Sequence, residues 1–429
     1  MIGLLKSTHQ SIFQYLADPK NRLATIGIFL FMVINIVQAV IRAAVYDFAD
    51  LNFFLDPAIG TRFFGQDPFI DWPDNSYPPF FYGVMSLITP FDRWFSSLLW
   101  ALLNVAFYIW IIAIVNAMIK ETQPERTKWS YFIAPLLTMI LFAINIHLGQ
   151  SNILMMLAII MAAYYLLKGK NLLTGVWLGF AMAYKVTPIF FVFYLVLKRK
   201  FKAAFFSLIF FGLFTVVAPM LFYSPARTIS FVDSWSKMIL EPFVKGEKVK
   251  STNVNYYHSN QSLDAFLNRH FTPYGQEHYD GFHDLINPDF FTEAQVSTIG
   301  KVIKLFIVAL LGFLAIKSRT VNNRVYPFEI SLFLMAILFI SPVSWVNHYI
   351  LILPAYIVSV NEILTLDKRN KGRKLLLWSM IIGTAIMHIG WGNYLQSLSP
   401  FFIGQIIFFI GLYIYSLRFA LSEKQVRAK

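Results

Sequence analysis

Long apolar stretches, separated by short polar segments, repeat along the whole chain. A helix needs about 20 predominantly apolar residues to cross the hydrocarbon core of a membrane. Stretches that approach this length cover residues 23–45, 96–118, 131–147, 152–168, 202–222, 299–317, 326–343, 348–363, 375–392 and 400–418. The pattern therefore predicts an all-α polytopic membrane protein.

The apolar run 171–197 differs from the others because Lys185 and Pro188 interrupt it. Basic clusters flank the run at both ends, so a single crossing would place one cluster on the wrong side of the membrane. Two short helices, 172–184 and 188–197, would return the chain to its starting side and carry Lys185 to the opposite surface. Such broken helices are stable only where they are buried or line a polar cavity. With this pair, we expect about twelve transmembrane helices.

Composition and charge support a membrane protein. The chain is 57% hydrophobic and 17% aromatic but only 14% charged, so a soluble fold would lack polar surface. The net charge of +13 comes from short Lys and Arg clusters between apolar runs, which is typical of membrane topology, and we expect no nucleic-acid partner. The absence of cysteine excludes disulfides and thiolate chemistry. The first apolar run has no small-residue cleavage site after it and is interpreted as a retained span.

The distribution of basic residues predicts the side of the membrane that each loop occupies. With about twelve helices, roughly two thirds of the 36 Lys and Arg residues fall on one side, which the positive-inside rule makes cytoplasmic. Both termini are then cytoplasmic. The segment 78–91 is too short for a span, and counting it as one would break the alternation. We expect a re-entrant or surface-lying helix there.

We expect one integral membrane domain with two large segments outside the cytoplasm. Residues 228–240 have the amphipathic character of a juxtamembrane helix. The expected parts are an N-terminal module 1–222 that includes the outer loop 46–95, an extracytoplasmic loop 223–298 and C-terminal helices 299–429. The conspicuous polar motifs all fall on the outer side, which favours one composite site at that surface.

The first outer loop holds Asp47, Asp50 and Asp56. A carboxylate just beyond a span is well placed to accept a proton from an attacking sugar hydroxyl. Hydration of the loop is the simpler explanation for these residues taken as a group, because loops need polar side chains. Only the spacing to Gly65 and Pro68 distinguishes Asp50 from the other two.

Lys185 is the candidate for binding an anion. An amine at membrane depth is costly and normally has an anionic partner, and a lipid phosphate at the outer interface is such a partner. A lysine that extends to the headgroups from a helix end is the ordinary alternative. We favour the functional interpretation because the chain breaks a helix to place this residue.

Amide and imidazole side chains mark the remaining outer turns. Gln150 and Asn152 can hydrogen-bond sugar hydroxyls or cap helix ends. The motif Asn260-Gln261-Ser262 is formally a glycosylation sequon, and it fits a turn or an N-cap before Leu263 equally well. The segment 341–348 closes one apolar run and starts the next. The imidazole of His348 can donate to a phosphate or orient a carboxylate, and Trp345 fits an interfacial aromatic residue. No pairing typical of zinc appears. The Asp cluster is only a weak signal for a divalent metal, and we expect no metal.

Taken in order, these motifs resemble glycosyltransferase family 87, the polyprenol-phosphate-mannose-dependent mannosyltransferases of the GT-C superfamily. The resemblance covers residues 45–350. It rests on Asp50 with Phe54, Gly65-x-x-Pro68-Phe69, Tyr77-Pro78-Pro79, Gly149-Gln150-Ser151-Asn152, Gly175-x-x-x-Gly179-x-Ala181-x-x-x-Lys185-x-x-Pro188, Asn260-Gln261-Ser262-Leu263 and Ser341-Pro342-x-Ser344-Trp345-x-x-His348.

The resemblance implies a GT-C fold and an enzyme of glycolipid biosynthesis. Such an enzyme moves a sugar, most often mannose, from a polyprenyl-phosphate donor to a lipid or glycan acceptor. It works with inversion at the anomeric carbon and without a nucleotide sugar or a cofactor. The expected location is the extracytoplasmic face of the bacterial cytoplasmic membrane.

The resemblance also implies roles for individual residues. Asp50 is the expected general base and His348 a second catalytic residue. The expected substrate-binding residues are Lys185, Tyr77, Gln150, Asn152, Asn260, Gln261, Ser262 and Trp345. Asn347 stands where the family usually has a histidine, and Asp47 remains a rival base because the spacing from Asp50 to Gly65 is longer than usual.

A transporter or flippase for a lipid or a sugar is the alternative function. Broken helices also occur in transporters. Transporters, however, place polar groups near the middle of the membrane, whereas these motifs gather at one surface, and no internal repeat is visible.

Overall fold

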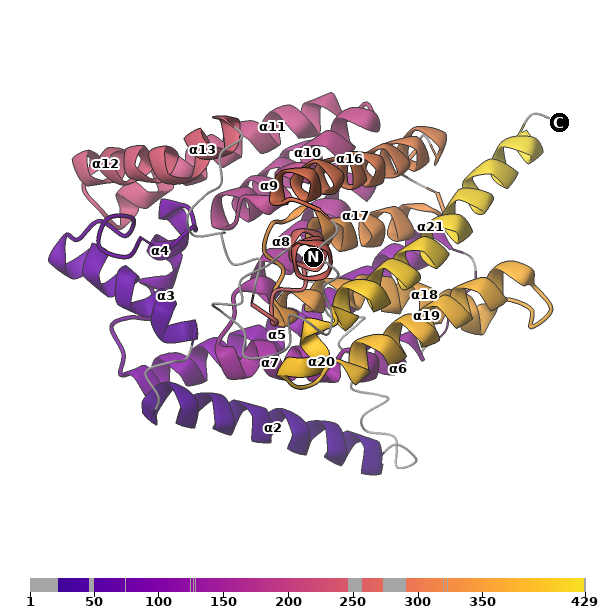
Figure 1. Ribbon diagram of the computed structural model, residues 1–429, viewed down its shortest axis with the longest axis horizontal. Helices are drawn as coiled ribbons and strands as arrows, with labels where there is room; N and C mark the ends of the chain where they lie inside the picture. The colour runs from indigo at the N-terminus through magenta and orange to yellow at the C-terminus, as the bar shows by residue number, and fades with distance from the viewer. Residues whose placement is uncertain are drawn as a thin grey trace. The chain divides into compact units, whose positions relative to one another are not determined.

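The structure is a computed structural model that describes residues 22–45, 50–73, 75–123, 125, 127, 129–245, 257–272, 291–318, 320–321 and 323–427. Within these ranges the chain is almost entirely helical (Figure 1), and an isolated bridge between Asn260 and Trp345 is the nearest approach to a strand. The predicted all-α fold is confirmed.

The described residues form two compact units. The first unit comprises parts of Met1–Ala117, Met139–Ile189 and Phe201–Ser251, and the second comprises parts of Met118–Thr138, Phe190–Lys200 and Thr252–Lys429. Each unit therefore combines segments that are far apart in the sequence.

The first unit contains most of the candidate residues of the N-terminal half. Its α-helices are α2 (Arg22–Val45), α3 (Asp50–Ile59), α4 (Pro79–Met85), most of α5 (Arg93–Thr122), α7 (Met139–Leu148), α8 (Asn152–Leu167), α9 (Asn171–Tyr184), α11 (Phe201–Gly212), α12 (Pro225–Trp235) and α13 (Glu241–Lys245). Short 3-10 or π turns are η2 (Gly60–Phe64), η3 (Thr187–Ile189), η4 (Leu213–Val217), η5 (Ala218–Leu221) and η6 (Ser236–Leu240).

The second unit contains the C-terminal candidate residues. Its helices are α6 (Ser130–Leu137), α10 (Phe190–Leu197), α14 (Leu263–Phe271), α16 (Glu293–Ser318), α17 (Tyr326–Ile340), the 3-10 helix η8 (Val346–Ile352), α18 (Leu353–Thr365), α19 (Lys371–Ile389), α20 (Asn393–Ser397) and α21 (Pro400–Arg427).

Several of these helices are long and apolar enough to cross a membrane. In the described residues, five meet this condition: Arg93–Thr122, Phe201–Leu221, Glu293–Ser318, Val346–Thr365 and Pro400–Leu421. The pair Ser130–Leu137 and Met139–Leu148 is a sixth candidate if its two helices form one span. The expected number of about twelve is not reached by this criterion, because other apolar segments, such as Asn152–Leu167 and Tyr326–Ile340, form helices shorter than a typical span.

The predicted break at Lys185 is confirmed. Helix α9 ends at Tyr184, and Lys185 has an extended backbone with φ −153° and ψ 128°. Pro188 accounts for this position, because a proline ring clashes with the carbonyl of the residue four positions earlier in a helix, which here is Tyr184. The short helix α4 lies within the predicted segment 78–91, and α12 together with η6 covers the predicted amphipathic segment 228–240.

Glycines allow close packing of α9 against α11 in the first unit. A Cβ atom on Gly175 would lie 2.4 Å from Cβ of Phe206, and one on Gly179 would lie 2.5 Å from Cβ of Phe210. Small residues one turn apart let the backbones of membrane helices approach closely. The Gly175-x-x-x-Gly179 part of the motif therefore packs the helix that ends beside Lys185.

In the second unit, α19 and α21 lie side by side (Figure 1). A Cβ atom on Gly383 of α19 would lie 2.5 Å from the carbonyl oxygen of Gly404 on α21. The same principle of small residues at the contact therefore operates here.

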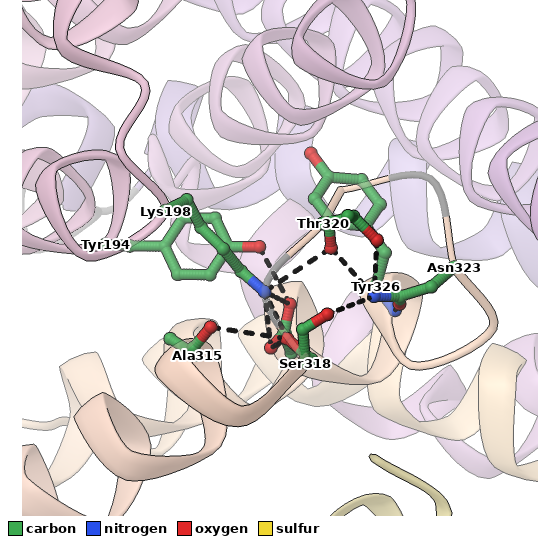
Figure 2. Close-up of polar contacts among 8 residues, drawn as sticks. Tyr194, Lys198, Ala315, Ser318, Thr320, Asn323 and Tyr326 are labelled. Carbon is green, nitrogen blue, oxygen red and sulfur yellow. Dashed lines mark hydrogen bonds and ion pairs between the residues drawn. The ribbon is translucent and has the colours of Figure 1, made fainter. Parts of the chain in front are cut away.

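A buried ion pair joins α10, α16 and α17 within the second unit. The Nζ atom of Lys198 lies 2.8 Å from Oε2 of Glu329, and both side chains are fully buried. Tyr194 donates to the same carboxylate at 2.9 Å, and the Ser318 hydroxyl donates to its other oxygen. Figure 2 shows Lys198 pointing into this group from beside Tyr194. Lys198 belongs to the basic cluster that follows the apolar run 171–197, and its charge is neutralised in this buried pair.

Candidate active site

A rigid turn positions the amide side chains of the first unit. Gly149 has φ +66°, which L-residues rarely adopt, and a Cβ atom there would lie 2.4 Å from Cβ of Leu51. The indole of Trp100 donates to the carbonyl oxygens of Gly149 and Gln150 at 2.9 and 3.2 Å. Only glycine fits this turn, which leads directly into Asn152 at the start of α8.

Four side chains from this region form one continuous chain of hydrogen bonds. The Nζ atom of Lys185 donates to Oδ1 of Asn152 at 3.2 Å, and Nδ2 of Asn152 donates to Oε1 of Gln150 at 3.3 Å. The Nε2 atom of Gln150 then donates to Oδ2 of Asp50. A cation and a carboxylate are thus connected through two neutral amides.

The ends of this chain are accessible and its middle is buried. Gln150 and Asn152 expose 4% and 1% of their surface, whereas Asp50 and Lys185 are partly exposed. Burial raises the pKa of the Asp50 carboxyl, an effect that the hydrogen bond from Gln150 and the charge of Arg42 oppose. The surrounding protein lowers the pKa of the Lys185 amine to about 8. The two groups that can react with a substrate are therefore those that a substrate can reach.

A cluster of aromatic side chains lies beside Lys185. The Nζ atom of Lys185 is 5.6 Å from the centroid of the Tyr77 ring, a distance at which a cation is attracted to the ring face. Tyr77 stacks on Phe81 with centroids 4.0 Å apart and meets the edge of Phe54 at 5.3 Å. Burial raises the pKa of the Tyr77 phenol to about 12, so this residue is a neutral contact surface at physiological pH.

The second unit brings Asn260, Gln261 and Ser262 against the loop that precedes Trp345. The Oδ1 atom of Asn260 accepts from the backbone N–H of Ser344 at 3.0 Å, and the Ser262 hydroxyl donates to the carbonyl of Pro342 at 2.9 Å. All three residues of the motif have no exposed surface. The structure gives them a role in holding this loop, and contact with a substrate remains a prediction.

Arg269 on α14 is a residue of this region that the sequence did not single out. Its guanidinium donates to the carbonyl oxygens of Asn260 at 2.7 Å and Tyr257 at 2.8 Å, and to the hydroxyl of Ser399 at 2.6 Å. One buried arginine thus ties the motif to a distant part of the same unit. The signal available in the sequence was a single arginine that follows the Asn260-Gln261-Ser262 motif by about two helical turns.

Trp345 and His348 are partly exposed at the end of the held loop. Trp345 meets the ring of Tyr257 edge to face, with centroids 6.3 Å apart, and the backbone N–H of His348 donates to the carbonyl of Trp345 at 2.9 Å. This local fold is compatible with both residues facing a ligand.

The candidate residues therefore form two groups. The first unit holds Asp50, Tyr77, Gln150, Asn152 and Lys185, and the second holds Asn260, Gln261, Ser262, Trp345 and His348.

Asp47 and Asp56 are the acidic residues that flank Asp50 in the first outer loop. Asp56 forms an exposed ion pair with Arg93 at 3.0 Å. Asp47 lies outside the described residues, so its rivalry with Asp50 remains open. Within the described part of the chain, no group of three His, Asp or Glu side chains is placed to hold a metal ion.

Comparison with protein families gives one finding. The model for Glycosyltransferase family 87 matches residues 75–342, a range that includes Tyr77, the turn at Gly149, Lys185 and the Asn260 motif. Neither a comparison with curated proteins nor one with solved structures gives a match.

Proposed function

Because the chain belongs to glycosyltransferase family 87 and is a membrane glycosyltransferase, we propose that it transfers mannose from a polyprenyl-phosphate donor to a lipid or glycan acceptor. Its helices provide the membrane setting, and the family match favours group transfer over transport. The observation that carries the proposal is the hydrogen-bonded chain from Lys185 to Asp50.

Lys185 is assigned to the donor phosphate in this proposal. In such a reaction the bond between the anomeric carbon and the phosphate oxygen breaks, and the phosphate leaves with the bonding electrons. A fixed cation stabilises the charge that develops on this leaving group. The partly exposed amine beside the Tyr77 ring suits this task.

Asp50 is assigned to the acceptor. Its carboxylate takes the proton of the acceptor hydroxyl while the hydroxyl oxygen attacks the anomeric carbon from the face opposite the phosphate. This displacement inverts the configuration and needs the base and the cation to be separated by the width of a sugar. Two amide side chains between Asp50 and Lys185 support such a separation. A carboxyl whose pKa is raised by burial is also a stronger base.

The remaining candidates receive roles on the same basis. We assign Trp345 and His348 to the substrate because they are partly exposed on a loop that buried residues hold in place. The site is proposed to face the extracytoplasmic side of the bacterial cytoplasmic membrane, with both termini in the cytoplasm, on the strength of the Lys and Arg distribution.

Transfer of radiolabelled mannose by the purified, reconstituted protein tests the proposal. Polyprenyl-phosphate mannose and a nucleotide-linked mannose are offered as alternative donors, with a total membrane lipid extract as the acceptor source. We expect incorporation from the polyprenyl donor and none from the nucleotide donor. Incorporation from the nucleotide sugar alone would refute the proposed donor class.

A matched pair of variants tests the base. Asp50→Asn is nearly isosteric but cannot take up a proton, so we expect transfer to fall by about 10²- to 10⁴-fold. Asp56→Asn on the same helix removes a carboxylate that belongs to an exposed ion pair and should leave most of the activity. Comparable activity in the two variants would remove Asp50 from the mechanism.

A further inference from the structure

The two amides between Lys185 and Asp50 have the same orientation. Each amide oxygen faces the lysine side, and each amide nitrogen faces the aspartate side. A cation, two aligned dipoles and an anion in this order reinforce one another, because each hydrogen bond polarises the next.

Helix α7 fixes this orientation. The Nδ2 atom of Asn145 donates to the backbone carbonyl of Leu141 at 2.9 Å, so its Oδ1 atom faces away from that carbonyl. This Oδ1 atom accepts from Nδ2 of Asn152 at 3.3 Å. An inverted Asn152 would place its oxygen against the oxygen of Asn145 and its nitrogen against the Lys185 ammonium. Both contacts would be unfavourable.

Burial limits what the amides can touch. Gln150 and Asn152 are almost completely covered, while the groups at both ends of the chain are partly exposed. The amide groups are also occupied by hydrogen bonds within the protein. This arrangement is suited to connecting two functional groups and poorly suited to binding sugar hydroxyls.

We propose that Gln150 and Asn152 are positioning residues that hold Asp50 in register with Lys185 and transmit the charge of the ammonium to the carboxylate. The proposal rests on the function assigned above to Asp50 and Lys185, and it replaces the expectation that the two amides bind substrate.

The connection links donor binding to the base. With the donor absent, the ammonium polarises both amides and strengthens the hydrogen bond from Gln150 to Asp50, which favours the ionised carboxylate. When a donor phosphate pairs with Lys185, this polarisation weakens and Asp50 becomes a stronger base. Among the described residues, Arg42 from α2 and Tyr77 from the segment before α4 also interact electrostatically with Asp50, and neither lies on the amide chain.

The pH dependence of kcat/KM for polyprenyl-phosphate mannose tests the connection. Gln150→Leu removes the direct hydrogen bond to Asp50, so the acid limb should move upward by about one to two pH units. Asn152→Leu removes only the polarisation and should move the same limb upward by about half a unit. Binding of polyprenyl phosphate alone should change by less than about threefold in both, because Lys185 keeps its charge. Asn116→Leu, which replaces a buried amide of the same unit away from this chain, should leave the limb in place.

A nearly isosteric variant guards against loss of folding. In Asn152→Asp the new carboxylate pairs with Lys185 and cannot donate to Gln150. Both limbs of the pH profile should therefore move upward, the alkaline limb because the ammonium is stabilised and the acid limb because a negative charge lies closer to Asp50.

The outcomes distinguish the positioning role of Gln150 and Asn152 from the role of Asp50 as the base. Unchanged acid limbs in the Gln150 and Asn152 variants, together with a raised KM, would overturn the positioning role and restore these residues as substrate contacts. An Asp50→Asn variant that retains transfer would instead refute the proposed base itself. Loss of transfer in Asp50→Asn with shifted limbs in the amide variants supports both.

Discussion

The alkaline limit of activity offers a sharp test of Lys185. The perturbation is Lys185→Arg, which keeps a positive charge but replaces an amine whose pKa the protein lowers to about 8 with a guanidinium that stays protonated. Because the charged form is the active one in our proposal, wild-type activity should be present below this pKa and be lost as the pH rises through it.

The magnitude follows from the lowered pKa. With a pKa of about 8, roughly nine tenths of the lysine is charged at pH 7 and about one tenth at pH 9. The wild-type kcat/KM for the donor should therefore fall about tenfold for each pH unit above this range. The Tyr77 phenol, with a pKa of about 12, does not titrate in this window.

The assay is transfer of radiolabelled mannose from the polyprenyl donor between pH 6 and pH 10. We expect Lys185→Arg to have a lower rate at pH 7, because its planar group differs in shape and hydration from an ammonium, and to lack the alkaline limb. Lys185→Ala should weaken binding of polyprenyl phosphate by about 10- to 150-fold, as expected for a charge-assisted hydrogen bond, and should also lack the limb.

Lys202→Arg, at an exposed position, is the control for a general effect of replacing lysine and should keep the wild-type profile. An alkaline limb near pH 8 that persists in Lys185→Arg would refute the reasoning, because another group would then be responsible for it.

Three other predictions concern packing and topology. Lys198→Ala should reduce the free energy of unfolding by about 3–5 kcal/mol, because it leaves the Glu329 carboxylate buried without its cation. Replacing both Lys198 and Glu329 with leucine should reduce it much less. Thermal unfolding in detergent measures the two losses, and equal losses would contradict the prediction. Gly179→Ala should destabilise by about 1–3 kcal/mol since the added methyl meets Phe210, while Gly212→Ala, with open space around it, is the control. A cysteine introduced at position 200 of this cysteine-free chain should react with an impermeant thiol reagent only after the membrane is permeabilised, and labelling of intact cells would overturn the predicted orientation.

Some features were predictable because they follow from local chemistry. Apolar runs of membrane-spanning length specify helices whatever lies around them. Pro188 ends a helix four residues earlier through its own ring, so the break before Lys185 was readable from the chain. The order of the motifs was sufficient to predict the family that the family match then confirmed.

Other features depended on contacts between distant segments. Lys198 lies in a basic cluster of the sequence, but its buried partner Glu329 lies on another helix, so the ion pair could not be predicted from the cluster. In the described residues, fewer helices meet the length criterion for a span than the apolar runs predicted, because segments such as Asn152–Leu167 form shorter helices. Arg269 was missed since most of its partners are backbone carbonyls, which every residue carries.

In the candidate site, too, some features follow from local chemistry and others from contacts between distant segments. From the sequence alone, the types of the reacting groups were determined, because a carboxylate, an amine and amides at turns have fixed chemistry wherever they lie. Only the tertiary structure decided that Gln150 and Asn152 connect Asp50 to Lys185 in one direction, and that Asn260 and Ser262 hold a loop. The physical reason is that a hydrogen bond depends on distance and direction between atoms, and these are set when helices pack rather than by the order of residues along the chain.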